Sequence, residues 1–165
     1  MEKFERNIKG SHSEMAFTSE DDLKRRRNLA GRILESLLLK VVDGTRITHT
    51  DTEEGFELVV PLPGDRKQKV YITANRRDSD GEVIFQIFTT CSKAQLLMYE
   101  PALRMNMDLD YGALAIKEIN GKDFLVIVDT QLAGTAQARE LEKSIITIAE
   151  AGDELENILT GKDIL

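Results

Sequence analysis

The apolar residues between positions 23 and 41 recur at steps of three and four, which is the period of an α-helix. Ser19 occupies the position of an N-terminal cap, and Asp43-Gly44 predicts the end of the helix. We therefore expect a helix with a single buried face. Its apolar residues are Leu23, Ala30, Ile33, Leu34, Leu37, Leu38 and Val41.

Four short segments with extended character follow this helix and are separated by tight turns. They cover residues 46–50, 56–61, 67–75 and 82–90, and such an order predicts an antiparallel meander. The fourth segment is a nearly continuous apolar run, so we expect this strand at the centre of the sheet with both faces covered. Pro61 and Pro63 cannot donate backbone hydrogen bonds, so the second strand should end at an edge or at the turn itself.

A broken helix is predicted after the fourth strand. Ser92 and Gln95 form a capping-box pattern that indicates its start. Pro101 biases the preceding residue away from helical geometry, so the second part should run from Pro101 to about Asn106. The apolar residues expected to face the core are Leu97, Met98, Ala102 and Met105.

Two polar residues near the end of this helix are expected to have structural roles. Asn106 suits a left-handed helix C-terminus. Arg104 is expected to pair with an acidic neighbour such as Asp108 or Asp110.

The hairpin at residues 113–130 is the clearest local signal in the chain. Asn120-Gly121 separates two apolar segments, residues 113–119 and 122–130, and both positions of a type I′ turn require a positive φ angle. Gly112 allows the backbone to bend or to pack closely just before the first of these strands. The second strand is apolar on both faces, so another element should cover it.

A final helix is predicted to provide that cover, with Thr135 as its cap. An apolar stripe runs along it, and this stripe could be a coiled-coil seam, a docking face for a partner helix or the side that lies on the sheet. We favour burial on the sheet because additional apolar residues widen the stripe. The stripe consists of Ala138, Leu141, Ile145, Ile148, Gly152, Leu155 and Leu159. The opposite side is acidic and includes Glu150, Glu154 and Glu156.

Composition narrows the classes of partner. The chain has 165 residues, 41% of them hydrophobic, which suits one soluble domain after a mobile leader at residues 1–18. A formal net charge of −7 opposes binding to nucleic acid or to anionic membranes, and we interpret the basic run Lys24 to Arg27 as a solvated helix side. The single cysteine and the absence of a long apolar run or leader peptide predict a cytoplasmic protein without a membrane span.

The residue pattern offers little catalytic chemistry. Cys91 has no base near it in sequence, because the two histidines are His12 in the leader and His49 in an early strand. The histidines are not accompanied by clustered cysteines, and no glycine-rich phosphate loop follows a strand. We therefore predict no catalytic residue, no metal and no cofactor.

Three motifs resemble the YbjN family, whose fold is similar to that of type III secretion chaperones. The first is Arg104-x-Asn106-x-x-Leu109-x-Tyr111-Gly112-Ala113 followed by apolar alternation. The second is Arg66-x-Gln68-x-Val70 at the start of the third strand. The third is the Leu-Thr-Gly-Lys-Asp sequence at residues 159–163. The resemblance runs from about Ser19 to the C-terminus, and it implies one α+β domain over residues 19–165.

The resemblance also implies a mode of action. Such a protein binds other proteins without catalysis, often as a homodimer, and acts as a chaperone-like or sensory and regulatory adaptor. An acidic surface makes a basic or amphipathic protein segment the expected client. The candidate interaction residues are Arg66, Gln68, Arg104, Glu150, Glu154 and Glu156. The rival hypothesis is a small-ligand sensor or an enzyme that uses a cleft near Cys91, and a deep polar pocket would favour it.

Overall fold

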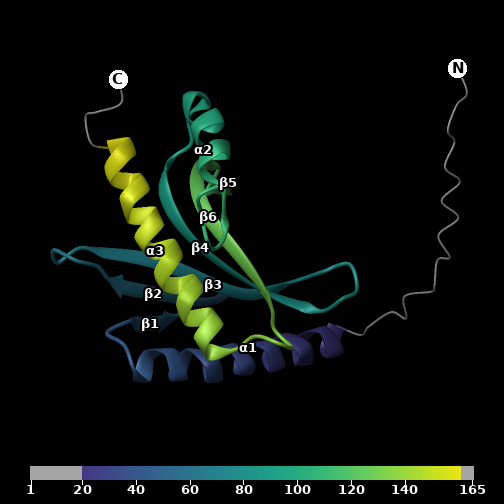
Figure 1. The fold of residues 1–165 in the computed structure, drawn as a ribbon. Coiled ribbons are helices and arrows are strands. Elements are labelled where there is room, and N and C mark those ends of the chain that lie inside the picture. Colours follow the sequence, from purple (N-terminus) through teal and green to yellow (C-terminus); the bar gives the residue numbers. More distant parts are fainter. Residues whose placement is uncertain (1–19, 161–165) are drawn as a thin grey trace, which may run out of the picture.

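The strands and helices follow one another in the order that the sequence pattern predicts (Figure 1). The structure is a computed structural model that describes residues 20–160, with side chains described for residues 29–158. Its helices are α1 (Glu20–Asp43), the 3₁₀ helix η1 (Leu96–Met98), α2 (Tyr99–Met105) and α3 (Ala138–Thr160). Its strands are β1 (Thr48–Asp51), β2 (Gly55–Pro61), β3 (Lys67–Arg77), β4 (Val83–Lys93), β5 (Ala113–Ile119) and β6 (Lys122–Leu132). The predicted leader, the Ser19 cap, the side chains of Lys24 to Arg27 and most of the last motif lie outside these described parts.

The six strands form one antiparallel sheet in the order β1-β2-β3-β4-β6-β5. Strands β1 to β4 are the predicted meander, and the β5–β6 hairpin joins the sheet beside β4 through β6. The prediction of an α+β fold with a meander and a hairpin is therefore confirmed, as is the central place of β4.

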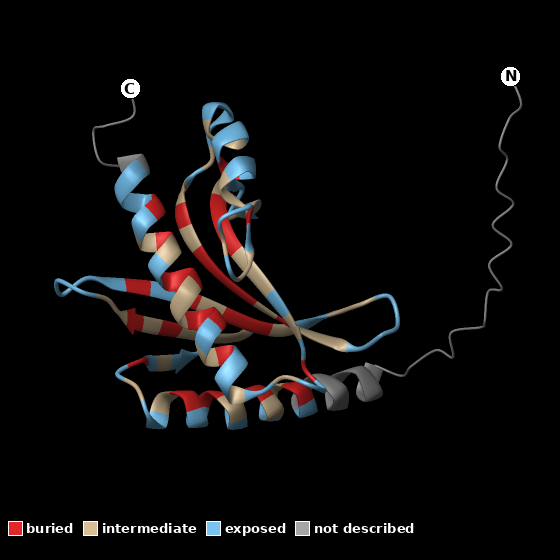
Figure 2. Ribbon diagram, in the orientation of Figure 1, coloured by how far each residue is buried: buried red, intermediate tan, exposed pale blue. Residues whose placement is uncertain are grey.

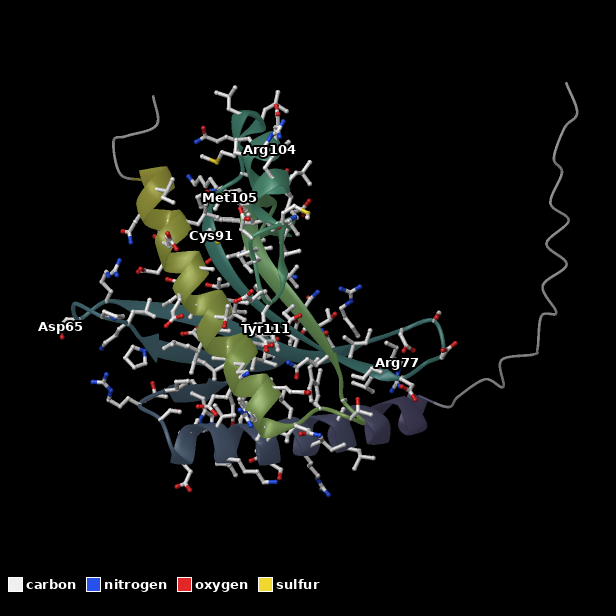
Figure 3. The ribbon with its side chains drawn as sticks, viewed as in Figure 1. Asp65, Arg77, Cys91, Arg104, Met105 and Tyr111 are labelled. Atoms are coloured by element: carbon white, nitrogen blue, oxygen red, sulfur yellow. The ribbon has the colours of Figure 1, made fainter. Side chains whose placement is uncertain are left out.

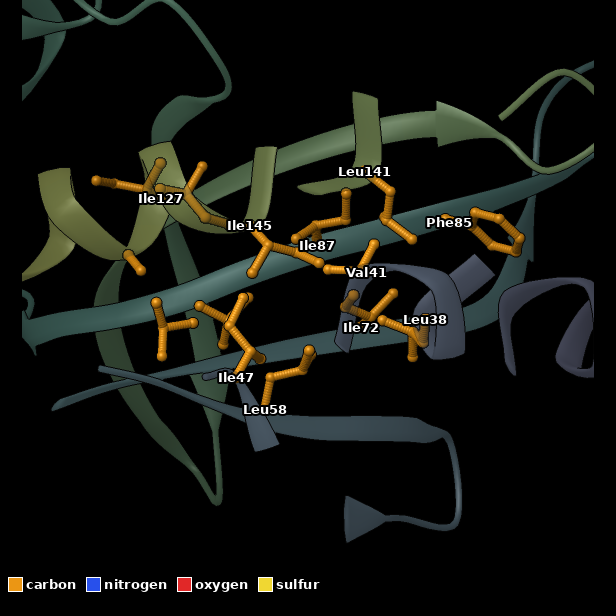
Figure 4. Close-up of a cluster of buried hydrophobic side chains, with 14 of the residues drawn as sticks. Leu38, Val41, Ile47, Leu58, Ile72, Phe85, Ile87, Ile127, Leu141 and Ile145 are labelled. Carbon is orange, nitrogen blue, oxygen red and sulfur yellow. The ribbon is translucent and has the colours of Figure 1, made fainter. Parts of the chain in front are cut away.

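The hydrophobic core lies between the sheet and the two long helices. Helix α3 crosses β3, β4 and β6, and α1 packs against both α3 and β3. Leu38 from α1, Ile145 from α3 and Ile87 from β4 belong to one buried cluster (Figure 4). Buried residues follow the middle of the sheet and the sides of the helices turned towards it (Figure 2).

The prediction that β4 is covered on both faces is wrong. Phe85 and Ile87 point into the core and are fully buried, whereas Ile84 and Gln86 on the other face stay half-buried. Phe88 on that second face is shielded by neighbours on the sheet itself. It stacks on Tyr71 with ring centroids 5.2 Å apart, and the Lys117 ammonium lies 4.7 Å from its ring centroid. Side chains of adjacent strands thus shield Phe88, although no helix or strand covers the rest of this face of β4 in the described part of the chain.

Helix α3 lies on the sheet as predicted. Its residues Leu141, Ile145 and Ile148 are fully buried, and Leu155 is nearly so. The stripe is therefore a core face of the domain. The side chain of Leu159 lies outside the described side chains.

Gly152 brings the backbone of α3 against the sheet. A Cβ atom at this position would lie 2.6 Å from Cγ2 of Thr89. Thr89 is held in place because its hydroxyl donates to the Lys69 carbonyl at 2.7 Å and accepts from Nε2 of Gln68 at 2.8 Å. A buried polar network therefore sits directly below the closest approach of helix and sheet.

The hairpin and the bend before it are confirmed. Asn120 and Gly121 have φ angles of 52° and 72°, as a type I′ turn requires. Gly112 has a φ angle of 76°, and a Cβ there would lie 2.9 Å from the Val128 carbonyl oxygen. Glycine is thus required at position 112 both by its conformation and by the proximity of β6.

The predicted helix caps at Thr135 and Ser92 are wrong. Helix α3 begins at Ala138, because the Gln137 carbonyl accepts the Leu141 amide, while Thr135 belongs to the preceding turn. Ser92 extends β4, and its hydroxyl donates to the Lys93 carbonyl instead of capping a helix. Side-chain oxygens at both sites had suitable spacing, but the strand ladder and the turn determine where the backbone donors go.

Helix α2 also begins earlier than predicted. It starts at Tyr99, and Pro101 lies in its first turn, where a missing N–H costs no helical hydrogen bond. Asn106 has right-handed geometry, with a φ angle of −58°. Arg104 pairs with Glu100 one turn earlier, at 2.7 Å, and not with Asp108 or Asp110.

Candidate functional site

An apolar cleft opens between η1–α2 and the C-terminal half of α3. Its volume is about 350 Å³, and we call it the α2–α3 cleft. One wall comes from η1 and α2, the other from α3, and Leu125 of β6 lies between them. The lining residues are Gln95, Leu97, Met98, Pro101, Ala102, Met105, Leu125, Leu155 and Ile158. Eight of these nine residues have apolar side chains, so the cleft suits apolar groups.

Helix α2 is held in place by its core side and by its C-terminal end. Ala102 is buried and Met105 packs against the core cluster. The Asn106 carboxamide accepts the Leu114 amide at 2.6 Å and donates to the Leu114 carbonyl at 3.5 Å. The Asn106 side chain thus pairs with β5 as the backbone of a neighbouring strand would. These two hydrogen bonds hold the α2 wall of the cleft against the sheet.

The mouth of the cleft exposes large apolar side chains. Leu97 is 88% exposed and Ile158 is 49% exposed, one on each side. The prediction that Leu97 faces the core is therefore wrong. The pattern of residues 96–107 contained a signal for this exposure, because apolar residues occur on nearly every side of the segment and a helix on the surface of a domain buries only one side.

A second, acidic groove borders the other side of the same stretch of α3. It has a volume of about 630 Å³, and Ile158 lines both this groove and the α2–α3 cleft. Arg66 reaches α3 from the β2–β3 loop and pairs with Asp153 at 2.6 Å. Glu150 and Glu154 also line the groove. An apolar surface and a carboxylate-rich surface therefore meet along the last turns of α3.

The structure brings together three of the six predicted interaction residues, namely Arg66, Glu150 and Glu154. Glu156 is exposed on α3, and its charge acts on Cys91. Arg104 lies on α2, at the end of the molecule away from α1 (Figure 3). Gln68 is buried in the network below Gly152, so its role there is to hold β3 to β4.

Cys91 is buried on β4 and belongs to the core cluster. Burial raises the pKa of its thiol to about 12, against a smaller lowering effect of a backbone hydrogen bond to Ile127, and the Glu156 charge raises it further. The Cys91 thiol is therefore kept neutral. The histidine considered with it in the sequence, His49, lies on edge strand β1 beside Phe56, with ring centroids 5.8 Å apart.

We predict that Cys91 in the folded protein resists alkylation by iodoacetamide. At about pH 9 an exposed thiol is roughly half ionised, whereas only about one in a thousand Cys91 thiols is ionised. Because folding raises the pKa of Cys91, the contribution of the neutral thiol to the stability of the fold is fully present below about pH 9. That contribution is lost as the pH rises towards 12. Mass spectrometry of time points with and without urea measures the protection. Equal rates in the folded and unfolded protein would show that the thiol is accessible and ionised.

Two further properties concern the described part of the chain. The described side chains contain no group of three His, Cys, Asp or Glu residues placed to hold a metal ion. Within residues 20–160, no helix has both the length and the apolar character needed to cross a membrane. In comparisons with known proteins, no protein-family model matches the chain, and no curated protein sequence is significantly similar to it.

Proposed function

We propose that this protein is a non-catalytic protein-binding module that holds a basic, amphipathic segment of a client in the α2–α3 cleft. The observation that supports this most strongly is the exposure of Leu97 and Ile158 at the mouth of an apolar cleft. Exposed apolar side chains of this size are unfavourable in water unless a partner covers them. An amphipathic helix can insert successive apolar side chains into such a groove.

Charge supports the basic character of the client. Glu150 and Glu154 are exposed on the same part of α3 that contributes Ile158 to the cleft. Ile158 lines both the cleft and the acidic groove, so the polar side of a helix seated in the cleft would extend past Ile158 towards these carboxylates. Lysine or arginine there would be favoured. The chain as a whole carries a formal charge of −7, which also steers basic segments towards it. The YbjN resemblance is consistent with a chaperone-like or regulatory adaptor of this kind, acting in the cytoplasm.

A small-ligand sensor is the second candidate. The cleft volume of about 350 Å³ falls within the usual size of small-molecule sites, which run from about 300 to 1,000 Å³. Its almost wholly apolar lining would suit a fatty-acid tail more than a reactive polar substrate. Cys91 is buried in the core and does not line this cleft, so an enzyme built on its thiol has no support from the geometry.

A peptide titration tests the proposal. A labelled Leu/Lys peptide with a helical apolar stripe is compared with a Leu/Glu peptide of the same stripe by fluorescence anisotropy. We expect the Leu/Lys peptide to bind and the Leu/Glu peptide to bind at least about tenfold more weakly. A medium-chain fatty acid that binds tightly while neither peptide does would favour the sensor instead.

A matched pair of variants separates local from overall charge. Glu150→Lys/Glu154→Lys changes the carboxylates beside the cleft, and Glu35→Lys/Glu118→Lys makes the same net change at exposed positions elsewhere. The first variant should bind the Leu/Lys peptide roughly tenfold more weakly at low salt, and the difference should shrink as salt rises. If both variants lose affinity equally, attraction to the net charge explains the binding and the assignment to α3 is wrong.

A further inference from the structure

The face of the sheet turned away from α1 and α3 is basic, and we call it the open sheet face. Ile87 points into the core, so its neighbours Gln86 and Phe88 mark the opposite face, and residues paired across the strands share a face. The strand pairing places six basic residues on the open sheet face, namely Lys67, Lys69, Arg76, Lys93, Lys117 and Lys122. Among the paired strand residues, Glu57 is the one acid on this face.

The other face of the same strands has the reverse charge. Its paired charged residues are four acids and one base, namely Asp51, Glu118, Asp123, Asp129 and Arg77. The chain as a whole has a formal charge of −7. The open sheet face is therefore a basic surface on an acidic protein, and it should attract a partner of opposite charge.

The lysines of the open sheet face surround apolar side chains. Val59, Ala115 and Val128 lie on it and are half-buried. Phe124 is paired with Lys93 on one side and with Lys117 on the other, so two ammonium groups flank one ring. In the described part of the chain, α1 and α3 pack on the core side of the sheet, and no helix or strand covers this face.

We propose that the open sheet face binds an acidic, amphipathic helix of a partner protein. The apolar side of that helix would lie on Val59, Ala115 and Val128, and its carboxylates would lie near the surrounding lysines. The sheet would then have a helix layer on each face. Binding should be weaker than that of the basic client, because a sheet surface encloses apolar side chains less fully than a cleft does.

A protein partner fits this face better than a nucleic acid does. Bases would need free aromatic ring faces on which to stack. Tyr71 from β3 stacks on Phe88, and the Lys117 ammonium from β5 lies over the same ring, so its two faces are occupied from the two sides of β4. Phe88 is also only 8% exposed. The basic residues are mostly lysines, which act as separate point charges and suit scattered carboxylates.

An NMR titration of the full chain with the Leu/Glu peptide at high concentration tests the location of the site. The methyl resonances of Val59, Ala115 and Val128 should shift, because these side chains lie on the open sheet face. Those of Leu97 and Ile158 should stay in place, because they line the α2–α3 cleft. Shifts at the cleft alone, or no shifts on the open sheet face, would overturn the proposal.

Glu57→Gln tests the charge of the face by a gain of affinity. Glu57 pairs with Lys69 at 2.7 Å, so removing its charge frees that ammonium for the partner. The variant should bind the Leu/Glu peptide about threefold more tightly by fluorescence anisotropy at low salt. Glu118→Gln makes the same change in net charge on the other face and should have little effect. Equal gains in the two variants would mean that only the net charge matters.

A reversal of two lysines tests the same face by a loss of affinity. Lys93→Glu/Lys117→Glu should bind the Leu/Glu peptide at least about tenfold more weakly. Lys40→Glu/Arg139→Glu makes the same net change at exposed positions on α1 and α3 and should lose much less. Circular dichroism checks that each variant is folded. Equal losses would contradict the assignment, and so would a single-stranded oligouridylate that binds more tightly than the peptide.

The two proposed sites can fail independently. The cleft uses no residue of the open sheet face, so Lys93→Glu/Lys117→Glu should still bind the Leu/Lys peptide in the cleft. Loss of Leu/Glu binding with Leu/Lys binding retained is the expected result.

Discussion

Replacing Ile148 with aspartate should abolish the cooperative unfolding transition of this protein. Ile148 is fully buried at the centre of the α3 stripe, within the cluster that joins α1, α3 and the sheet. A carboxylate there would be removed from water, and the described structure offers it no cationic partner in that cluster. Loss of the apolar contacts and burial of a charge together cost more than about 4 kcal/mol, a large part of the stability of a domain this size.

Thermal unfolding followed by circular dichroism, together with the soluble yield, measures this effect. Ile158→Asp on the same helix is the matched control, because its side chain is half exposed and should leave the transition nearly unchanged. A folded Ile148→Asp variant with a normal melting temperature would mean that α3 can leave the sheet. Its stripe would then be a docking seam and not a core face.

Gly152→Ala should destabilise the domain by about 1–3 kcal/mol, although alanine favours helix over glycine by about 1 kcal/mol. The added Cβ would lie 2.6 Å from Cγ2 of Thr89. Thr89 cannot move aside easily, because its hydroxyl is bound to the Lys69 carbonyl and to Gln68. Helix α3 must therefore lift from β4 to admit one methyl group.

Thr89→Ser is the compensating change. It removes Cγ2 and keeps the hydroxyl, so the hydrogen bonds with Gln68 and Lys69 remain. We expect Gly152→Ala to be nearly neutral in the Thr89→Ser background, which gives a coupling free energy of about 1–3 kcal/mol in a double-mutant cycle by urea unfolding. Additive effects of the two changes would show that the contact between helix and sheet is not at this position.

Local residue chemistry accounts for much of the fold. Asn120-Gly121 predicts its turn because few residues accept two positive φ angles, and the apolar stripe of α3 predicts its burial because a helix of that pattern needs a surface to cover. The helix starts were less predictable. At Ser92 and Thr135 a side-chain oxygen had the spacing of a helix cap. In the structure, however, the backbone at Ser92 belongs to strand β4 and the backbone at Thr135 forms a turn with Leu132. Such competition depends on residues that are distant in the chain.

The candidate site was only partly predictable for a similar reason. The acidic side of α3 follows from helical spacing alone, but the approach of Arg66 to Asp153 depends on how β2 and β3 pack under α3. The α2–α3 cleft lies between two helices that are far apart in sequence, so no pattern within either helix could predict it. Leu97 seemed a core residue because it is apolar. It lies in η1, and the η1–α2 segment turns the side with Ala102 and Met105 towards the core, which leaves Leu97 exposed.

Methyl NMR of the wild-type protein with the Leu/Lys peptide tests the central claim most directly. The account predicts that the methyl resonances of Leu97, Met105 and Ile158 shift on titration, because these side chains line the α2–α3 cleft. The methyl groups of Ile116 and Leu132, which are 46% and 40% exposed and lie outside the cleft, should stay in place. Shifts confined to Ile116 or Leu132, or peptide binding that leaves the three cleft residues unchanged, would contradict the assignment of the cleft as the client-binding site.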